Sequence, residues 1–470
     1  TGTNSYSRRT YIQANTLYAI DGVGLPTATT VIFQSPDWNS VESILMSSGT
    51  ITRELGSDTE APGRISWWNG SGGFAARGGP LVVSFPNAGA PLLWGSNNRG
   101  FNGQLLQLNS QYADDLVTIT HNIDMQGSRS IVVYDNLLSD QDVGQLSGVL
   151  SGNQLRKEGN ESKEAGTLWL SGANTFTDRL HMDQGTVRAI DGVGLPTGAE
   201  LFFEGDNENF PVSFESSGTF TRNIGLGNGE VYWQEEGGFA AWGGPLVVTL
   251  EGGIELQWND GNIGFRGQRL TMGSRTANDV VEMANDIYLN GNRDIYATDN
   301  PFSENDHVLF SGHLRDSGNN LQIYLDGTVK FDSTTLAFLN MRGTTKAYLN
   351  GTHAITTVNT ENNNASTIGG SGTVTASNFD IRSLATLAPG DEGAGTLTTI
   401  VSVGNGLWMW GNSTYEWELG AIAYDSVDQT GHLKIDAPWT VKLVSDGGTP
   451  LPTSEYDLFT YSGTFQGAFT

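Results

Sequence analysis

A nine-residue segment, AIDGVGLPT, occurs twice in this chain, at residues 19–27 and again at 189–197. Longer stretches near it also recur, because GGFAARGGPLVV at 72–83 matches GGFAAWGGPLVV at 237–248. A repeated length of this size exceeds one supersecondary unit, so each copy must hold several smaller units. The duplication therefore limits the chain to an architecture that can be extended by adding similar units.

A shorter repeat identifies the smaller unit as a strand that follows a corner. Glycine relieves the backbone at a corner, and Thr, Val and Leu favour the strand that follows. Such a unit roughly every 22 residues is typical of a solenoid whose coils stack on one another. Gly-Thr precedes alternating apolar residues in six segments: AGTLWL (165–170), QGTVRA (184–189), DGTVKF (326–331), NGTHAI (350–355), SGTVTA (371–376) and AGTLTT (394–399).

These patterns predict an all-β fold, a parallel β-helix or β-solenoid with two long internal repeats. The first repeat occupies 1–154 and begins within a coil, the second occupies 155–320, and β-rich coils fill 321–470. Strand-like alternation in SIVVYD (130–135) and LQIYLDG (321–327) agrees with this interpretation. Tandem β-sandwiches are the alternative, because they also have short strands and frequent turns.

Composition excludes several classes of function. The chain of 470 residues has 24 Lys and Arg against 51 Asp and Glu, and its net charge is −27. A nucleic-acid binder needs basic stripes, so we expect no nucleic-acid partner. No apolar run is as long as a membrane span of about 18 residues requires. With no cysteine, disulfides, thiolate metal sites and thiol nucleophiles are impossible.

We expect no catalytic residue, no cofactor and no metal site. Adjacent acids such as Asp114-Asp115 point to opposite faces of a strand, so they do not form a glycosidase pair. The loop EGDNEN (204–209) offers oxygen ligands but lacks a calcium-binding pattern. The histidines show no metal-binding spacing and are expected to be ordinary surface or strand residues: His121, His181, His307, His313, His353 and His432.

The tryptophans are expected to pack inside the fold. Trp94 and Trp258 occupy matching places in the two repeats, which favours a repeated packing role. Trp408 and Trp410 lie two residues apart and so share one strand face. A carbohydrate-stacking platform is the alternative for these aromatic side chains.

The segment LRKEGNESKEAGTLWLSGANTFTDRLHMDQGTVRA (155–189) resembles the autotransporter-associated β-strand repeat, although Asp178 stands where that repeat usually has Gly. LAPGDEGAGTL (387–397) and YDLFTYSGTFQGAF (456–469) resemble the usual ending of the same family. The resemblance implies a secreted or surface-associated bacterial protein with a β-helical body. We therefore expect an extracellular or cell-surface location, with a signal peptide removed.

The two ends of the chain predict how it assembles. TGTNSYSRRTYIQANTLYAIDG (1–22) aligns with 171–192, but the strand GTLWL (166–170) that precedes the second copy has no counterpart before the first. Unpaired sheet edges pair with other chains, and two unlike edges give an open head-to-tail filament. The expected subunit interface consists of Tyr6, Tyr11, Ile12, Leu17, Leu458, Phe459, Tyr461, Phe465 and Phe469.

The predicted function is therefore a structural subunit of an extracellular filament or surface layer, not an enzyme. Its partners are copies of itself, joined by β-strand donation, with an extracellular polysaccharide as a further partner. A monomeric adhesin that binds glycans and a polysaccharide-degrading β-helix enzyme are the alternatives.

Overall fold

The computed structural model describes residues 2–35, 42–56, 62–68, 70–86, 88, 91–95, 101, 103, 105–159, 165–205, 211–258, 266–267, 269–316, 318–391, 393–420, 423–446 and 455–467. Within these ranges the fold is all-β, and the one helical element is a 3-10 turn at Glu251–Gly253. No helix in the described part of the chain is long and apolar enough to cross a membrane.

The chain forms two compact units. Unit 1 holds residues 1–217 and 223–242, and unit 2 holds 218–222 and 243–470. β19 (Val212–Phe220) and β21 (Gly237–Val248) contribute to both units.

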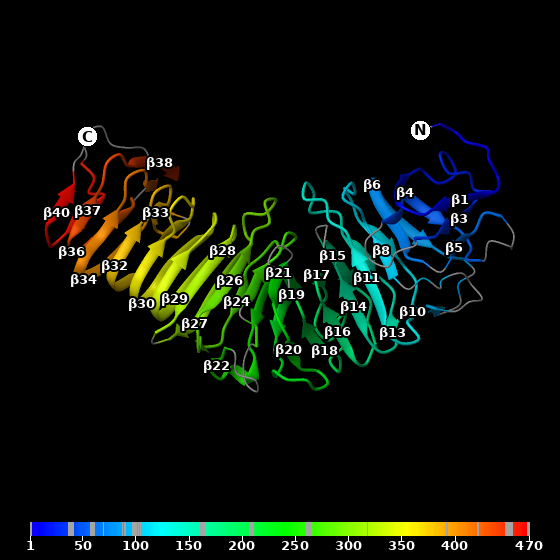
Figure 1. The fold of residues 1–470 in the computed structure, drawn as a ribbon, viewed down its shortest axis with the longest axis horizontal. Coiled ribbons are helices and arrows are strands. Elements are labelled where there is room, and N and C mark those ends of the chain that lie inside the picture. The colour runs from blue at the N-terminus through cyan, green and yellow to red at the C-terminus, as the bar shows by residue number, and fades with distance from the viewer. Residues whose placement is uncertain are drawn as a thin grey trace. The chain divides into compact units, whose positions relative to one another are not determined.

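Unit 1 consists mainly of parallel strands, each of which pairs with strands earlier or later in the chain. In one column Leu155 pairs with Leu180, Leu180 with Leu201, and Leu201 with Val231, and all four side chains are buried. Figure 1 shows their strands side by side. These four strands are β14 (Leu155–Glu158), β16 (Arg179–Met182), β18 (Glu200–Phe203) and β20 (Val231–Trp233). The other strands that lie wholly in unit 1 are β1 (Arg9–Ile12), β2 (Asn15–Tyr18), β3 (Thr30–Phe33), β4 (Ser43–Thr52), β5 (Ile65–Trp67), β6 (Gly72–Ser84), β7 (Leu92–Leu93), β8 (Leu105–Leu108), β9 (Val117–Ile119), β10 (Ile123–Asp124), β11 (Arg129–Val133), β12 (Gly144–Leu146), β13 (Leu150–Ser151), β15 (Thr167–Leu170) and β17 (Gly185–Arg188).

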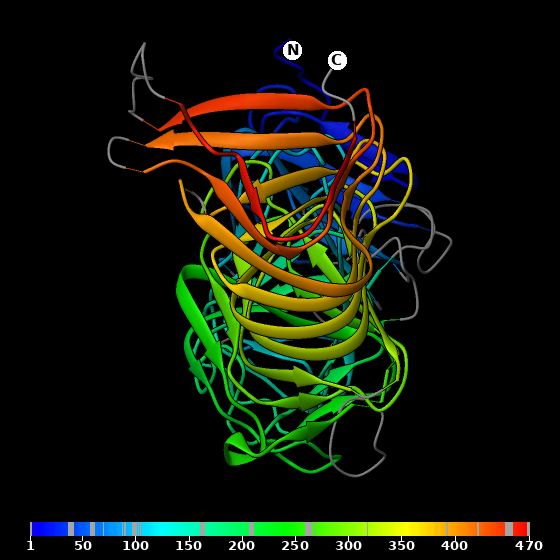
Figure 2. The same cartoon turned by 90° about the vertical axis from the view of Figure 1, so that its left-hand side faces the viewer.

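Unit 2 continues the same kind of parallel pairing. Val308 pairs with Val329, Val329 with Ala347, Ala347 with Ile368, and Ile368 with Leu387. Each of these side chains is buried, so the column forms part of the core; the yellow and orange strands of this unit follow one another in layers in Figure 2. The strands of unit 2 are β22 (Leu256–Gln257), β23 (Arg269–Gly273), β24 (Val281–Met283), β25 (Ile287–Tyr288), β26 (Arg293–Thr298), β27 (His307–Arg315), β28 (Asn320–Leu325), β29 (Thr328–Met341), β30 (Lys346–Thr360), β31 (Thr367–Gly370), β32 (Thr373–Ile381), β33 (Thr386–Pro389), β34 (Thr396–Met409), β35 (Thr414–Gly420), β36 (Ser426–Gly431), β37 (Leu433–Ile435), β38 (Thr440–Asp446), β39 (Phe459–Tyr461) and β40 (Phe465–Gly467).

The sequence duplication is also a structural duplication. The backbone N–H of Asn4 donates to the carbonyl of Val23 (3.0 Å), and that of Asn174 donates to Val193 (2.9 Å). Their side-chain amides donate to the next carbonyls, Gly24 and Gly194, both at 2.7 Å. Each asparagine therefore fastens the turn formed by its copy of AIDGVGLPT.

The Gly-Thr segments begin strands as predicted, with one exception. β15, β29, β32 and β34 each start at the Thr of such a segment, and β17 starts at the preceding Gly. NGTHAI instead lies inside β30, so the corner predicted at Gly351 is wrong. A register shift between Phe331 and Ser333, where β29 pairs with β30, lets the chain pass this point without ending the strand.

Candidate functional site

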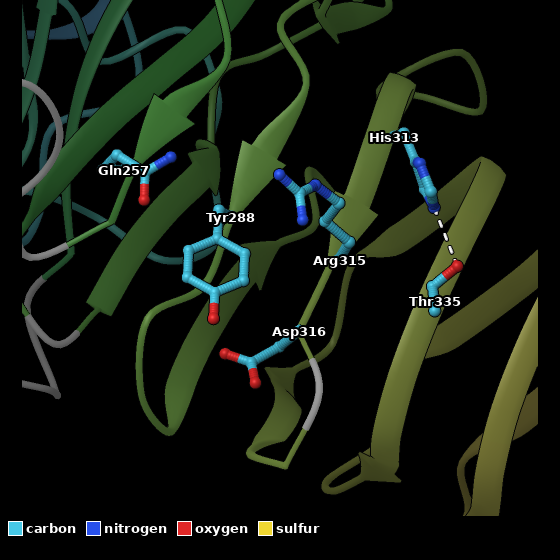
Figure 3. Close-up of a pocket in the computed structure, with 6 residues that line it drawn as sticks. All are labelled: Gln257, Tyr288, His313, Arg315, Asp316 and Thr335. Atoms are coloured by element: carbon cyan, nitrogen blue, oxygen red, sulfur yellow. Dashed lines mark hydrogen bonds between the residues drawn. The ribbon is translucent and has the colours of Figure 1, made fainter.

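A groove of about 460 Å³ lies on the outer surface of unit 2. Gln257 pairs with Tyr288, Tyr288 with Arg315, and Arg315 with Thr335, so these four residues form a row across β22, β25, β27 and β29. Their side chains line the groove together with those of His313 and Asp316 (Figure 3). The row exists because parallel strands in register place equivalent residues side by side.

Strand alternation explains why these side chains face outward. Their neighbours Leu256, Ile287, Leu314 and Thr334 are buried, and each pairs with the next in the same register. Successive side chains of a strand point to opposite faces, so the residue beside each buried one faces the solvent. The core therefore fixes the spacing of the row.

Arg315 is held in the groove by two contacts. Its guanidinium forms a two-point ion pair with Glu255, with N–O distances of 2.5 and 2.7 Å. Hydrogen bonding to Glu255 raises the pKa of Arg315. The guanidinium carbon also lies 5.0 Å from the centre of the Tyr288 ring, and Gln257 donates to Glu255 (3.2 Å). Glu255 thus orients two of the side chains in the row.

The remaining two residues are fixed by local hydrogen bonds. Asp316 is buried, and its carboxylate accepts from the backbone N–H of Gly318 (2.9 Å) and from the Asn319 amide (3.0 Å). His313 lies with its Nε2 3.0 Å from the hydroxyl of Thr335 (Figure 3). The groove therefore presents one aromatic ring, one cation and several hydrogen-bonding groups on a rigid support.

The repeated tryptophans lie in the core, as predicted. Trp94 and Trp258 are buried, and their indole N–H groups donate to the carbonyls of Gly103 (2.7 Å) and Gly267 (2.8 Å). Trp408 and Trp410 share a face, as predicted, and stack with ring centres 3.9 Å apart. The expectation that they pack inside the fold is wrong, because both are half-buried and alternate with the buried Leu407 and Met409, which places them on the outer face. Neither pair lines the groove.

The predicted interface residues are divided between the two units. In unit 1 Ile12 is buried, Leu17 is half-buried, and Tyr6 and Tyr11 are 44% and 43% exposed. In unit 2 Leu458, Phe459 and Phe465 are half-buried, Tyr461 is 47% exposed, and Tyr461 and Phe465 have ring centres 5.9 Å apart. Phe469 lies outside the described residues.

A group of ionisable side chains in unit 1 was not recognised from the sequence. Nε2 of His181 lies 2.6 Å from Glu204 Oε2 and 3.1 Å from Asp183 Oδ1. Burial lowers the pKa of His181 and raises the pKa of Asp183. His181 and Asp183 are two residues apart, a spacing that signals a shared strand face; the contribution of Glu204 depends on the pairing of β16 with β18. The rest of the loop from Glu204, residues 206–209, lies outside the described residues.

No protein-family model matches this chain, and searches among curated proteins and solved structures found no significant match. The resemblance to the autotransporter-associated repeat therefore stays a prediction. The fold and the groove are the basis for assigning a function.

Proposed function

We propose that the chain is a parallel β-solenoid that acts as an extracellular scaffold and binds a polysaccharide in the groove around Tyr288. The buried columns support the solenoid, because one residue of each coil lies beside its counterpart in the next coil. Stacking of this kind is characteristic of solenoids and produces long continuous surfaces suited to extended ligands.

The observation that carries the binding proposal is the row from Gln257 through Tyr288 and Arg315 to Thr335. Neighbouring strands are about 4.8 Å apart, so four strands extend about 14 Å from the first to the last. This length suits a short oligosaccharide better than a single sugar ring. The support beneath the row is a buried sheet, so the side chains are already arranged before a ligand binds.

The chemistry of the row matches that of a sugar chain. The face of Tyr288 is apolar and packs against the C–H groups of a sugar ring, while its hydroxyl remains available for hydrogen bonding. Gln257 offers both a donor and an acceptor, and Thr335 offers a hydroxyl. Arg315 offers further guanidinium N–H donors, while its charge is balanced by Glu255, so the row suits the hydroxyl groups of a sugar chain.

The groove favours binding over hydrolysis. Glycosidases use two carboxyl groups that face each other across the scissile bond. Asp316 is the one carboxylate among the described lining residues, and backbone and amide N–H groups already occupy it. Glu255 is paired with Arg315, so neither acid is placed as a general acid.

Binding of acidic and neutral oligosaccharides to the purified protein, measured by calorimetry, tests this proposal. Tyr288→Ala removes the ring and is expected to weaken binding roughly tenfold, or by about 1.4 kcal/mol. Tyr112→Ala is the matched control, because Tyr112 is 55% exposed and lies in unit 1. Equal affinities of the two variants would contradict the assignment, and release of reducing ends would indicate an enzyme instead.

Self-assembly is a second candidate function. Tyr6, Tyr11 and Tyr461, three of the predicted interface residues, expose close to half of their surface. Exposed aromatic side chains are enriched in protein–protein interfaces. We expect Tyr6→Ser combined with Tyr11→Ser to shorten or abolish filaments seen by electron microscopy, with Tyr112→Ser as control. Filaments of the same length and number in both variants would contradict this function.

A further inference from the structure

We propose that His181, Asp183 and Glu204 form a binding site for a divalent first-row transition-metal ion such as Zn²⁺. One ligand atom of each residue lies within 4.8 Å of the other two. The proposal is independent of the groove, since these residues belong to unit 1 and the groove belongs to unit 2.

Strand register places the three ligands together. β16 pairs with β18 through His181–Phe202 and Met182–Phe203, so the residues that follow, Asp183 and Glu204, also lie side by side. The backbone N–H of Glu204 donates to the carbonyl of Met182 (2.9 Å), which extends this register by one step. His181 thus lies in β16, and Asp183 and Glu204 directly follow the ends of the paired strands β16 and β18.

The two carboxylate oxygens of Asp183 differ in their partners: one is paired with Arg156, and the other accepts no hydrogen bond among the described residues. Arg156 binds Oδ2 through Nε and Nη2, both at 2.7 Å. Oδ1 is buried, accepts no hydrogen bond among the described residues and points toward Nε2 of His181 at 3.1 Å. A buried carboxylate oxygen without a donor is unfavourable, and a metal ion at this position would satisfy it.

The imidazole is oriented by groups around it. Nδ1 of His181 lies 3.1 Å from the Gln154 amide. The amide nitrogen of Gln154 faces Nδ1 in this structure. Turning the amide by 180° brings its oxygen to Nδ1, where it accepts the Nδ1–H and leaves Nε2 unprotonated as a ligand, the arrangement usual for metal-bound histidine. Phe202 packs edge-on against the ring with centres 4.7 Å apart and restricts its rotation.

Charge and spacing also suit a divalent ion. Two carboxylates and the Arg156 guanidinium, which lies 3.9 Å from Glu204, leave a net negative charge at the site. The ligand atoms need to separate to about 3.3 Å, the spacing given by bonds of about 2.0 Å at tetrahedral angles. Glu204, whose side chain is 38% exposed, can make this movement, and water can complete the coordination from its side.

The identity of the ligands determines the class of metal. Imidazole nitrogen with two carboxylates suits Zn²⁺ and its first-row neighbours, whereas Ca²⁺ and Mg²⁺ prefer oxygen-only sites. We therefore expect Zn²⁺ to bind in the presence of excess Ca²⁺, and Co²⁺ to give visible absorption bands in the same site.

The first repeat supplies a variant that is designed to fold. The positions of His181, Asp183 and Glu204 are occupied there by Tyr11, Gln13 and Gln34, and the two glutamines hydrogen bond at 3.1 Å. The triple variant H181Y/D183Q/E204Q therefore copies a combination that this scaffold already accommodates. Circular dichroism checks that the variant is folded.

Zn²⁺ titration of the chelator-treated full chain tests the site. We expect one strongly bound Zn²⁺ in the wild type, binding more than about tenfold weaker in Glu204→Gln, because even outer-shell losses cost roughly 10–100-fold, and none at this site in the triple variant. Glu416→Gln, which changes an acid in unit 2 that pairs with Lys442, should keep full affinity. Wild-type affinity in the triple variant, or no Zn²⁺ binding by the wild type, would overturn the proposal.

Discussion

The first and second repeats bury equivalent residues but present different outer ones. The row that forms the groove, Gln257–Tyr288–Arg315, corresponds in the first repeat to Leu93–Asp124–Ser151, which pairs in the same parallel register. The scaffold has therefore been kept while its surface chemistry has changed. The difference teaches that the outward residue of each strand pair can change while the buried residue beside it keeps its place.

A second outer position shows an exchange of partners. In the second repeat Arg188 lies over the ring of Trp242 at 3.9 Å, and in the first repeat Arg77 lies over the ring of Tyr18 at 5.8 Å. The matching sequences place Arg188 where Tyr18 stands and Trp242 where Arg77 stands. The positively charged side chain and the aromatic ring have therefore exchanged positions between the repeats. A cation–ring contact is present in both repeats, although the residues at both positions differ.

The largest expected effect tests whether the two cores are equivalent. Trp94→Ala and Trp258→Ala each remove a buried indole and leave a carbonyl, that of Gly103 or Gly267, without its donor. We expect each to lower the free energy of unfolding by about 3–5 kcal/mol, measured by guanidinium denaturation. Trp68→Ala, at a 45% exposed side chain, should cost about 0.5 kcal/mol or less. A loss below about 1 kcal/mol in one core variant alone would show that the cores differ.

The asparagines that hold the AIDGVGLPT turns should differ in importance. Asn174 is buried, donates to Gly194 and accepts from the backbone N–H of Leu150 (2.8 Å). Asn4 makes the equivalent bond to Gly24 but is exposed. Asn174→Ala leaves buried groups unpaired and should cost about 1–3 kcal/mol, more than Asn4→Ala. Equal changes in the two denaturation curves would refute this ranking.

The repeats also share a buried acid whose ionisation depends on pH. The backbone N–H of Asn136 donates to Asp142 (2.8 Å), and that of Asn300 donates to Asp306 (2.7 Å). Burial raises the pKa of Asp306 to about 7, and burial together with the nearby Asp135 also raises the pKa of Asp142.

Because the folded pKa of Asp306 exceeds the unfolded value, its stabilising contribution is complete below about pH 4 and is lost as the pH rises through 7. Asp306→Asn should remove this part of the pH dependence, an effect on the order of 1–2 kcal/mol after allowance for partial exposure. Asp142→Asn should likewise remove stabilisation that is present at low pH. Its effect on the pH dependence should extend to higher pH, because burial raises the pKa of Asp142 to about 9. Thermal unfolding from pH 4 to 9 measures both, and an Asp306→Asn profile parallel to the wild type would contradict the assignment.

The smallest expected effect concerns the exchanged cation–ring contacts. Trp242→Leu removes the closer ring from the buried Arg188 and should cost about 1–2 kcal/mol. Arg77→Leu removes the exposed, more distant cation and should change stability by about 0.5 kcal/mol or less. A larger loss for Arg77→Leu in the same denaturation assay would reverse this interpretation.

Sequence patterns predicted the all-β fold, most strand starts and the burial of Trp94 and Trp258, because these depend on alternation and on the repeat itself. The corner expected at Gly351 was wrong, since a register shift in a strand pair is invisible in one strand's pattern. The groove was missed for a related reason. Tyr288 and Arg315 come together only because β25 pairs with β27 in one register, and that pairing is a tertiary property.

The same limit applies to His181 and Glu204, which lie on different strands and become neighbours through the pairing of β16 with β18. The spacing of His181 and Asp183 was visible in the sequence, but two ligands without a third do not define a metal site. The predicted subunit interface, whose residues run from Tyr6 to Phe469, stays a prediction.

The column of Val308, Val329, Ala347, Ile368 and Leu387 bears on how the length of such a protein can change during evolution. Each inner member pairs with the residue before and the residue after it, and all five are aliphatic side chains. A gene that gains or loses one repeating unit of strands would therefore join two aliphatic residues of this column again. Length is a property that such a protein can change through recombination more easily than it can change its cross-section.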